Sequence, residues 1–308
     1  MPTTRVLFGL SLAAGILALA WLDWQTLNWP GVWLFPVLFL CVAVAGVESI
    51  RLFPAAGVPL FPRLTIAGSL AMITACWGTA LGWIATHRDF GLTVRLAREV
   101  VGASSVVVFV AMASVVAGAF LTALARYRKA AKDAKPCGAL AAAVGTTFAV
   151  AYVGLLSCFL IQLRMAFGMK ALVSLLVVIK LSDTGAFTAG KLFGKHPMAP
   201  VLSPNKTIEG AIGAVVSGIA ASCLVFLVLV PWLAKAPFSG SWISVVLYGL
   251  VLSVVGIWGD LAESLLKREA DTKDSSRLIP GLGGALDLLD STLLAAPVAY
   301  LFWLFWLF

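Results

Sequence analysis

Charged side chains are scarce in this sequence. Only 12% of the 308 residues are Asp, Glu, Lys or Arg, about half of the share in an ordinary soluble domain, and 61% are apolar. The mean hydropathy is +1.01. A soluble protein of this size leaves roughly a quarter of its chain's surface in water, so it could not hide so many apolar side chains. Disordered chains need low hydrophobicity and high net charge. The composition therefore indicates a membrane protein.

Paired cysteines and short alternating segments are lacking as well. The five cysteines contain no CxxC pair, and four of them lie inside apolar runs, which argues against a disulfide framework or a zinc site. We interpret them as small core residues. A membrane barrel would show alternation in short segments, whereas this chain has long unbroken apolar runs. We therefore expect an all-α, polytopic membrane bundle.

Long apolar runs are what the sequence does have. A helix crosses the hydrocarbon core in about 20 residues. Runs between charged or Pro/Gly-rich breaks predict nine spans, at residues 6–22, 31–47, 64–85, 100–125, 138–162, 169–190, 209–233, 242–264 and 285–306.

The net charge of +8 is best explained by orientation in a membrane, with no need for a nucleic-acid partner, because the basic residues lie mainly between the apolar runs. With the N-terminus inside, fifteen Lys and Arg residues fall on the inner side and six on the outer side. This asymmetry predicts an N-in, C-out topology. The exception is the stretch 86–99, with three arginines on the outer side, for which we consider an amphipathic helix in the interface.

The two halves of the chain differ in their acidic content. Residues 1–182 hold five of the 14 acidic residues and residues 183–308 hold nine. We therefore divide the chain into N-terminal transmembrane helices, residues 1–137, and a C-terminal catalytic region, residues 138–308. No internal repeat is evident, which counts against an inverted-repeat transporter.

Lys180 and Asp183 are three residues apart in an apolar helix, so they share a face. Each costs at least about 2.5–3.5 kcal/mol at mid-membrane if it faces lipid. They therefore form either a buried ion pair that fixes packing or part of an ion or phosphate site. Both interpretations stay open from the sequence alone.

The following loop combines glycines, lysines and hydroxyls. Ser203 and Thr207 can donate to phosphate oxygens or cap the next helix, and Lys206 lies between them. The plainer alternative is a basic cytoplasmic loop with a helix cap.

Acidic pairs occur at two places near the end of the chain. Asp260 and Glu263 share one helix face with Lys267, at spacing i, i+3, i+7, and such acids repel each other unless a cation lies between them. A hard divalent cation is a natural partner. Asp287 and Asp290 follow a glycine-rich loop, where they either cap a helix or complete a metal-assisted phosphate site. So tight a cluster in so charge-poor a chain favours the phosphate site.

The same stretch resembles the signature of the CTP:phosphatidate cytidylyltransferases, also called CDP-diacylglycerol synthases. The matching residues are Ser264, Lys267, Arg268, Lys273, Asp274, Pro280, Gly281, Gly283, Gly284, Asp287 and Asp290. Upstream, Ser203-Pro204-Asn205-Lys206-Thr207-Ile208-Glu209-Gly210 is similar to a second element of the family, and Asp183 begins a third. Two residues depart from the pattern, since Leu282 replaces the usual His and Leu288 the usual Arg.

The resemblance implies transfer of CMP from CTP to phosphatidate, giving CDP-diacylglycerol and pyrophosphate, with Mg²⁺ required. It leaves open whether a second cation joins Mg²⁺, and it suggests a homodimer. The expected main metal ligands are Asp260 and Asp287, which are also expected to be catalytic, and Asp290 and Glu263 are expected to support them. The residues expected to act on the phosphates are Lys206, Lys267, Arg268 and Lys273. The residues expected to complete the substrate site are Ser203, Thr207, Gly281, Gly283, Gly284 and Asp183.

The location follows from both substrates. CTP is cytoplasmic and phosphatidate lies in the inner leaflet, so we expect a multi-pass protein of a bacterial inner membrane whose site faces the cytoplasm. Three alternatives remain: a related CTP-dependent enzyme on another lipid phosphate or lipid alcohol, a secondary transporter, and a catalytically silent scaffold. The departures at Leu282 and Leu288 are the reason for considering a silent scaffold. Lys180 and Asp183 would suit a transporter.

Overall fold

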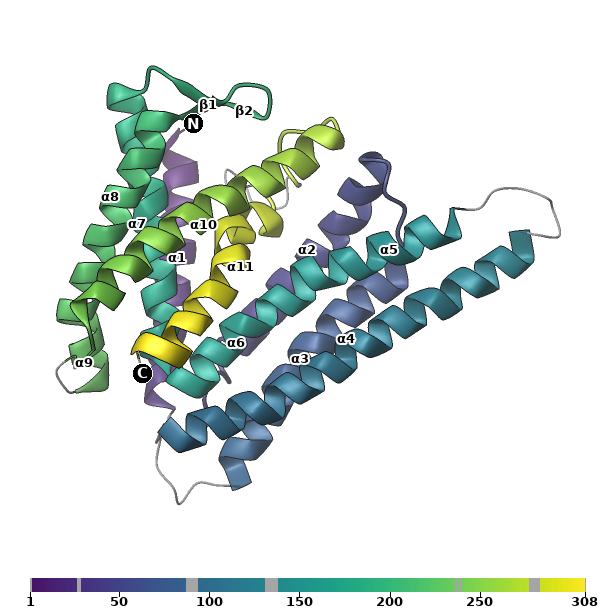
Figure 1. The fold of residues 1–308 in the computed structure, drawn as a ribbon, viewed down its shortest axis with the longest axis horizontal. Coiled ribbons are helices and arrows are strands. Elements are labelled where there is room, and N and C mark those ends of the chain that lie inside the picture. Colours follow the sequence, from purple (N-terminus) through teal and green to yellow (C-terminus); the bar gives the residue numbers. More distant parts are fainter. Residues whose placement is uncertain are drawn as a thin grey trace. The chain divides into compact units, whose positions relative to one another are not determined.

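The structure is a computed structural model that describes residues 2–26, 29–86, 94–130, 138–235, 238, 240–276 and 283–307. Its elements are almost all helices (Figure 1). They are α1 (Pro2–Gln25), α2 (Phe35–Ala55), α3 (Pro62–Thr86), α4 (Val94–Ala130), α5 (Ala139–Val150), η3 (Ala151–Leu155), α6 (Leu156–Phe167), α7 (Met169–Phe193), β1 (Pro197–Ala199), β2 (Ser203–Thr207), α8 (Ile208–Leu224), η4 (Val225–Leu229), α9 (Val230–Ala234), α10 (Trp242–Glu269), α11 (Ala285–Phe302) and η5 (Trp303–Leu307), where η marks a π-helical turn.

The predicted membrane bundle is confirmed. Within the described residues, eight helices or continuous helical runs are long and apolar enough to cross a membrane, and each overlaps a predicted span. Helix α1 coincides with the remaining predicted span, residues 6–22. The protein is therefore an integral membrane protein with an all-α architecture.

Two local expectations need adjustment. Residues 94–99 belong to the same continuous helix as the span that follows, so this part of the stretch 86–99 is no separate interfacial helix; residues 87–93 lie outside the described part. The loop before α8 contains a small antiparallel hairpin, in which Pro197 pairs with Thr207 and Ala199 with Ser203. The sequence indicated only a loop there, with no hairpin.

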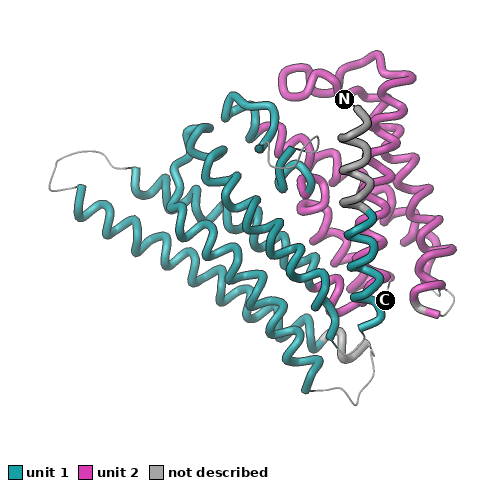
Figure 2. Tube along the Cα trace, turned by 180° about the vertical axis from the view of Figure 1, so that it is seen from behind, with its two compact units in different colours: residues 1–161, 266–288 teal, residues 162–265, 289–308 magenta. Residues whose placement is uncertain are grey.

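The chain forms two compact units, shown in different colours in Figure 2. Unit 1 comprises residues 1–161 and 266–288, and unit 2 comprises residues 162–265 and 289–308. The division between residues 1–137 and 138–308 was drawn from composition and motifs, and it stays a prediction.

Small residues set the packing in unit 1. Phe61 packs with Ala119, Ala123 and Ala142 in a buried cluster where α3, α4 and α5 meet. A side chain at Gly154 would place its Cβ 2.9 Å from the Ser69 Cα. Membrane helices pack through such small residues because close backbone approach gives van der Waals contact that lipid cannot replace.

Unit 2 also contains a closely packed helix pair. Helices α7 and α8 run side by side (Figure 1), and a Cβ on Gly185 would lie 1.9 Å from the Ser217 Oγ. The Ser182 hydroxyl donates to the Ala214 carbonyl across this contact at 3.1 Å. We call this contact the α7–α8 seam.

The hairpin sits between these two helices in the chain. The Thr207 Oγ1 accepts the Gly210 N–H at 3.1 Å, so Thr207 caps α8. The Glu209 carboxylate accepts the backbone N–H groups of Lys195 at 3.1 Å and His196 at 3.3 Å. These bonds tie both ends of the hairpin to the start of α8.

Candidate active site

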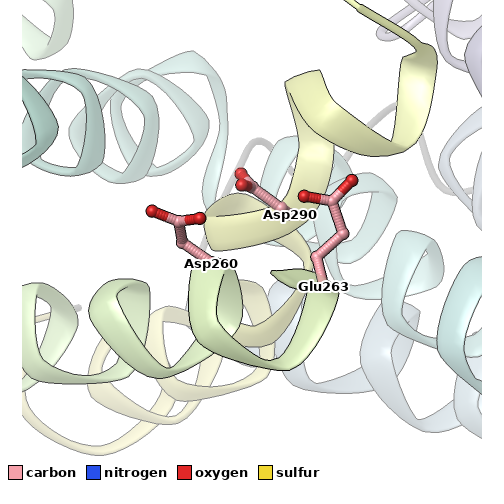
Figure 3. Close-up of side chains that lie close together, drawn as sticks. All are labelled: Asp260, Glu263 and Asp290. Atoms are coloured by element: carbon pink, nitrogen blue, oxygen red, sulfur yellow. The ribbon is translucent and has the colours of Figure 1, made fainter. Parts of the chain in front are cut away.

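Three carboxylates meet in unit 2. Asp260 and Glu263 come from α10 and Asp290 from α11, and one oxygen of each lies within 4.8 Å of the others (Figure 3). We call these residues the carboxylate cluster. Asp260 and Glu263 share a face because they are one helical turn apart. The figure shows all three carboxylates turned toward one another.

A glycine on α10 brings Asp290 into this group. A Cβ at Gly259 would lie 2.7 Å from the Asp290 carbonyl oxygen and 2.9 Å from the Ser291 Cα. The backbone of α11 therefore approaches α10 more closely than any side chain would allow. This approach occurs one residue before Asp260, so the two aspartates are neighbours.

Two of the three carboxylates are buried, and the third is partly exposed. Glu263 is 1% exposed and Asp290 is 9% exposed, whereas the Asp260 side chain is 39% exposed. Three like charges at this spacing repel one another, most strongly where water is excluded. A hard divalent cation with oxygen ligands offsets this repulsion. The exposed Asp260 is the point at which the cluster is open to solvent.

Lys206 joins the cluster from the hairpin. Its Nζ lies 2.7 Å from the Asp260 Oδ2. Because Lys206 lies on β2, the hairpin is what positions this cation beside the acids. Ser203 begins the same strand, opposite Ala199.

Lys180 and Asp183 form an ion pair at 3.5 Å on α7, with both side chains nearly half exposed. Asp183 also interacts electrostatically with Asp260 and Lys206, and Asp290 with Lys180. The pair thus belongs to the same polar region as the carboxylate cluster. If all are charged, the four carboxylates of this region and its two lysines leave a formal charge of −2, which one divalent cation would balance. These residues are Asp183, Asp260, Glu263, Asp290, Lys180 and Lys206.

Asp287 makes a different set of contacts, with residues of unit 1. Its Oδ1 accepts from the Lys267 Nζ at 2.8 Å. Its Oδ2 accepts from the Ser275 N–H at 3.1 Å, the Ser275 hydroxyl at 2.8 Å and the Gly284 N–H at 2.7 Å. Asp287 is not a member of the carboxylate cluster. That Asp287 ligates a metal therefore stays a prediction.

Both described glycines of the signature lie against Asp287. Gly283 has φ +85°, and a Cβ there would lie 2.2 Å from the Asp287 Oδ2. The Gly284 amide was expected to bind phosphate, but here it donates to Asp287. Gly281 and Leu282 lie outside the described residues. Arg268 and Lys273 are exposed, at the end of α10 and in the bend after it.

Sequence reasoning missed one acidic residue that contacts the signature. Glu48 on α2 is fully buried and accepts hydrogen bonds from residues 275, 276, 285 and 286. The available signal was that it is one of only five acidic residues before position 183. Its partners, more than 220 positions away, were not predictable from spacing.

The fold defines a polytopic integral membrane protein, and the site adds a carboxylate cluster suited to a divalent cation. A sequence model described as the cytidylyltransferase family matches residues 3–306, so the chain belongs to that family.

Three curated relatives, each called phosphatidate cytidylyltransferase, illustrate the similarity. The Helicobacter pylori (strain 26695) protein is 43% identical over 131 residues, which is 42% of this chain and 46% of the relative. The Bacillus subtilis (strain 168) protein is 39% identical over 156 residues, 50% of this chain and 55% of the relative. The Mycobacterium leprae protein is 42% identical over 126 residues, 41% of this chain and 38% of the relative. The chain thus spans about half the length of the first two relatives, and less of the third.

Proposed function

We propose that this protein transfers CMP from CTP to phosphatidate, forming CDP-diacylglycerol and pyrophosphate. The observation that carries the proposal is the carboxylate cluster with Lys206 beside it, in a chain that belongs to the cytidylyltransferase family. The relatives' names, phosphatidate cytidylyltransferase, supply the two substrates.

The residues of the cluster fit Mg²⁺. Asp260, Glu263 and Asp290 offer three carboxylate oxygens within 4.8 Å of one another, which is the ligand chemistry that this cation prefers. When bound, Mg²⁺ neutralises phosphate charge and polarises phosphoryl oxygens. The need for Mg²⁺, and a second cation beside it, are part of the proposal.

The chain's own residues bring two polyanions together. A phosphate oxygen of phosphatidate forms a bond to the α-phosphorus of CTP, and the bond from that phosphorus to the β-bridging oxygen breaks, so pyrophosphate leaves with its electron pair. The phosphatidate phosphate is already an anion, so no strong general base is required. The task that remains is neutralising charge and aligning the attack.

Basic and hydroxyl groups would hold the phosphates. Lys206 is already held beside the cluster by Asp260, so it needs little reorganisation to contact a nucleotide phosphate. Thr207 accepts from Gly210 as a helix cap, which leaves its hydroxyl hydrogen for a phosphate oxygen. Lys267, Arg268 and Lys273 are further phosphate ligands in this proposal.

The proposed site faces the cytoplasm of a bacterial inner membrane. Fifteen basic residues on the inner side against six on the outer side support the N-in topology, which puts the loop of Lys206 and the end of α10 inside. CTP then enters from water while the lipid stays in its leaflet. The homodimer is proposed from the resemblance alone, and the mass of the detergent-solubilised protein would test it.

The experiment is a cytidylyl-transfer assay in detergent–lipid micelles, with labelled CTP and chromatography of the lipid products. Asp260→Asn and Asp290→Asn should each lower the rate more than about 100-fold, which corresponds to about 2.7 kcal/mol of lost transition-state stabilisation. Glu269→Gln is the matched control, because Glu269 is an exposed carboxylate at the end of the same helix α10. We expect it to keep the wild-type rate.

Two outcomes would contradict the proposal. Near-normal transfer by both aspartate variants would remove the cluster from the chemistry. Labelled product only with an acceptor other than phosphatidate, in a mixture of lipid phosphates and lipid alcohols, would keep the nucleotide chemistry and reject the proposed acceptor.

A further inference from the structure

Glu48 is a buried carboxylate in the N-terminal part of the chain that accepts four hydrogen bonds from residues of the signature stretch. Its side chain is fully buried on α2. The Oε1 accepts from the Ser276 hydroxyl at 2.6 Å and the Ala285 N–H at 3.0 Å. The Oε2 accepts from the Ser275 hydroxyl at 3.2 Å and the Leu286 N–H at 2.9 Å. All five residues belong to unit 1.

These bonds cap a helix from a distant part of the chain. Ala285 and Leu286 are the first two residues of α11, and the first N–H groups of a helix have no partner within it. A carboxylate there satisfies both N–H groups and also interacts favourably with the helix dipole. The start of α11 is therefore fixed by a residue 237 positions earlier in the sequence.

The cap is linked to Asp287 through Ser275. The Ser275 hydroxyl lies 3.2 Å from the Glu48 Oε2 and 2.8 Å from the Asp287 Oδ2. Asp287 in turn holds the Lys267 ammonium at 2.8 Å. No side chain fits at Gly284, because a Cβ there would lie 2.1 Å from the Ser275 Oγ and 2.2 Å from the Glu48 Oε1.

We propose that Glu48 is a positioning residue for the cytidylyl-transfer site: it fixes the first turn of α11 and, through Ser275, the Asp287–Lys267 pair. This inference rests on the proposed function. It assigns a task to the N-terminal helices, because α2 then helps to set the geometry of residues that act on the phosphates.

Glu48→Gln tests the inference with little change of volume. Each oxygen of Glu48 faces one backbone N–H, so either orientation of the glutamine amide places its NH₂ against Ala285 or Leu286. The serine hydroxyls can rotate to accept from the new NH₂ group. A backbone N–H cannot rotate, so it loses its acceptor and faces another donor. We expect kcat to fall at least about tenfold, with the KM for CTP changed less than about threefold, because the loss concerns alignment in the transition state.

Asp23→Asn is the matched control. Asp23 is also fully buried in unit 1, and it also accepts two backbone N–H groups, from Gly31 at 3.2 Å and Trp33 at 3.1 Å. It makes these bonds outside the signature. We expect a similar loss of thermal stability, with kcat within about threefold of the wild type.

A second measurement needs no turnover. In hydrogen exchange followed by mass spectrometry, the amides of Ala285 and Leu286 should exchange at least about tenfold faster in Glu48→Gln and at the wild-type rate in Asp23→Asn. Ser276→Ala, which removes one hydroxyl from Glu48, should show a smaller change in the same direction. It serves in place of Glu48→Gln if that variant does not fold.

The outcomes separate this inference from the proposed function. A wild-type protein without cytidylyl transfer would reject the proposed function, and the exchange rates would still decide whether Glu48 holds α11. Equal kcat in Glu48→Gln and Asp23→Asn, or unchanged exchange at Ala285 and Leu286, would overturn the positioning role. In the double variant with Ser275→Ala, fully additive losses of kcat would overturn the link through Ser275.

Discussion

Gly259→Ala is expected to damage the carboxylate cluster without touching any of its side chains. The added Cβ would lie 2.7 Å from the Asp290 carbonyl oxygen, whereas ordinary contact begins at 3.4 Å. The backbones of α10 and α11 must therefore separate by about 0.7 Å at this point, the difference between the two distances. Asp290 moves with its own carbonyl, away from Asp260.

The size of the effect follows from the shift. A displacement near 1 Å at a reacting centre costs up to about 100-fold in rate, and overpacking of this kind costs about 1–3 kcal/mol of stability. We therefore expect the rate of cytidylyl transfer to fall about 30- to 100-fold, as estimated from that displacement. The Mg²⁺ concentration for half-maximal activity should rise, because Asp290, one of the three proposed ligands, has moved away from the other two.

Gly256→Ala is the control on the same helix face. A Cβ there would meet the Ile179 Cδ1 at 3.1 Å, the movable end of a side chain, and the Ser291 Cβ at 3.8 Å. Replacing glycine by alanine inside a helix also gains about 1 kcal/mol of propensity, so this variant should be active and of near-normal stability. If Gly259→Ala kept an activity within about threefold of Gly256→Ala, the argument that Gly259 sets the cluster geometry would be refuted, because the displacement should cost considerably more.

The other predictions concern the signature and the hairpin. Asp287→Asn should lower cytidylyl transfer more than about 100-fold; a Mg²⁺ titration with an unchanged midpoint would then exclude Asp287 as a metal ligand and leave it as a partner of the signature loop. Restoring both departures together, with Leu282→His and Leu288→Arg, should raise the rate if they weaken phosphate binding, and an unchanged rate would show that the leucines cost nothing. Glu209→Gln weakens the bonds from the hairpin to α8 and should raise the KM for CTP about three- to tenfold, in line with the loss of one or two hydrogen bonds; an unchanged KM would separate the hairpin from nucleotide binding.

The membrane spans were predictable because their signal is local. A helix in lipid satisfies its own backbone, so length and apolar composition suffice to identify it. The hairpin gave no such signal, since strands of three and five residues containing proline have little periodicity. It forms because the end of α7 and the start of α8 bring Pro197 and Thr207 together.

The candidate site was predictable only up to the helix that carries each residue. The spacing of Asp260 and Glu263 places them on one face of α10 whatever surrounds it. Which aspartate of α11 would join them depends on where that helix crosses α10, and Gly259 decides this in favour of Asp290. Glu48 could not be found in this way, because its contacts depend entirely on tertiary packing.

The α7–α8 seam limits how a lipid could reach the polar region. At Gly185 the two helices lack room even for a methyl group, which would lie 1.9 Å from the Ser217 Oγ. An acyl tail is thicker than a methyl group, so it cannot slide between these helices. The tails of the proposed diacyl substrate must therefore extend into the bilayer by another route.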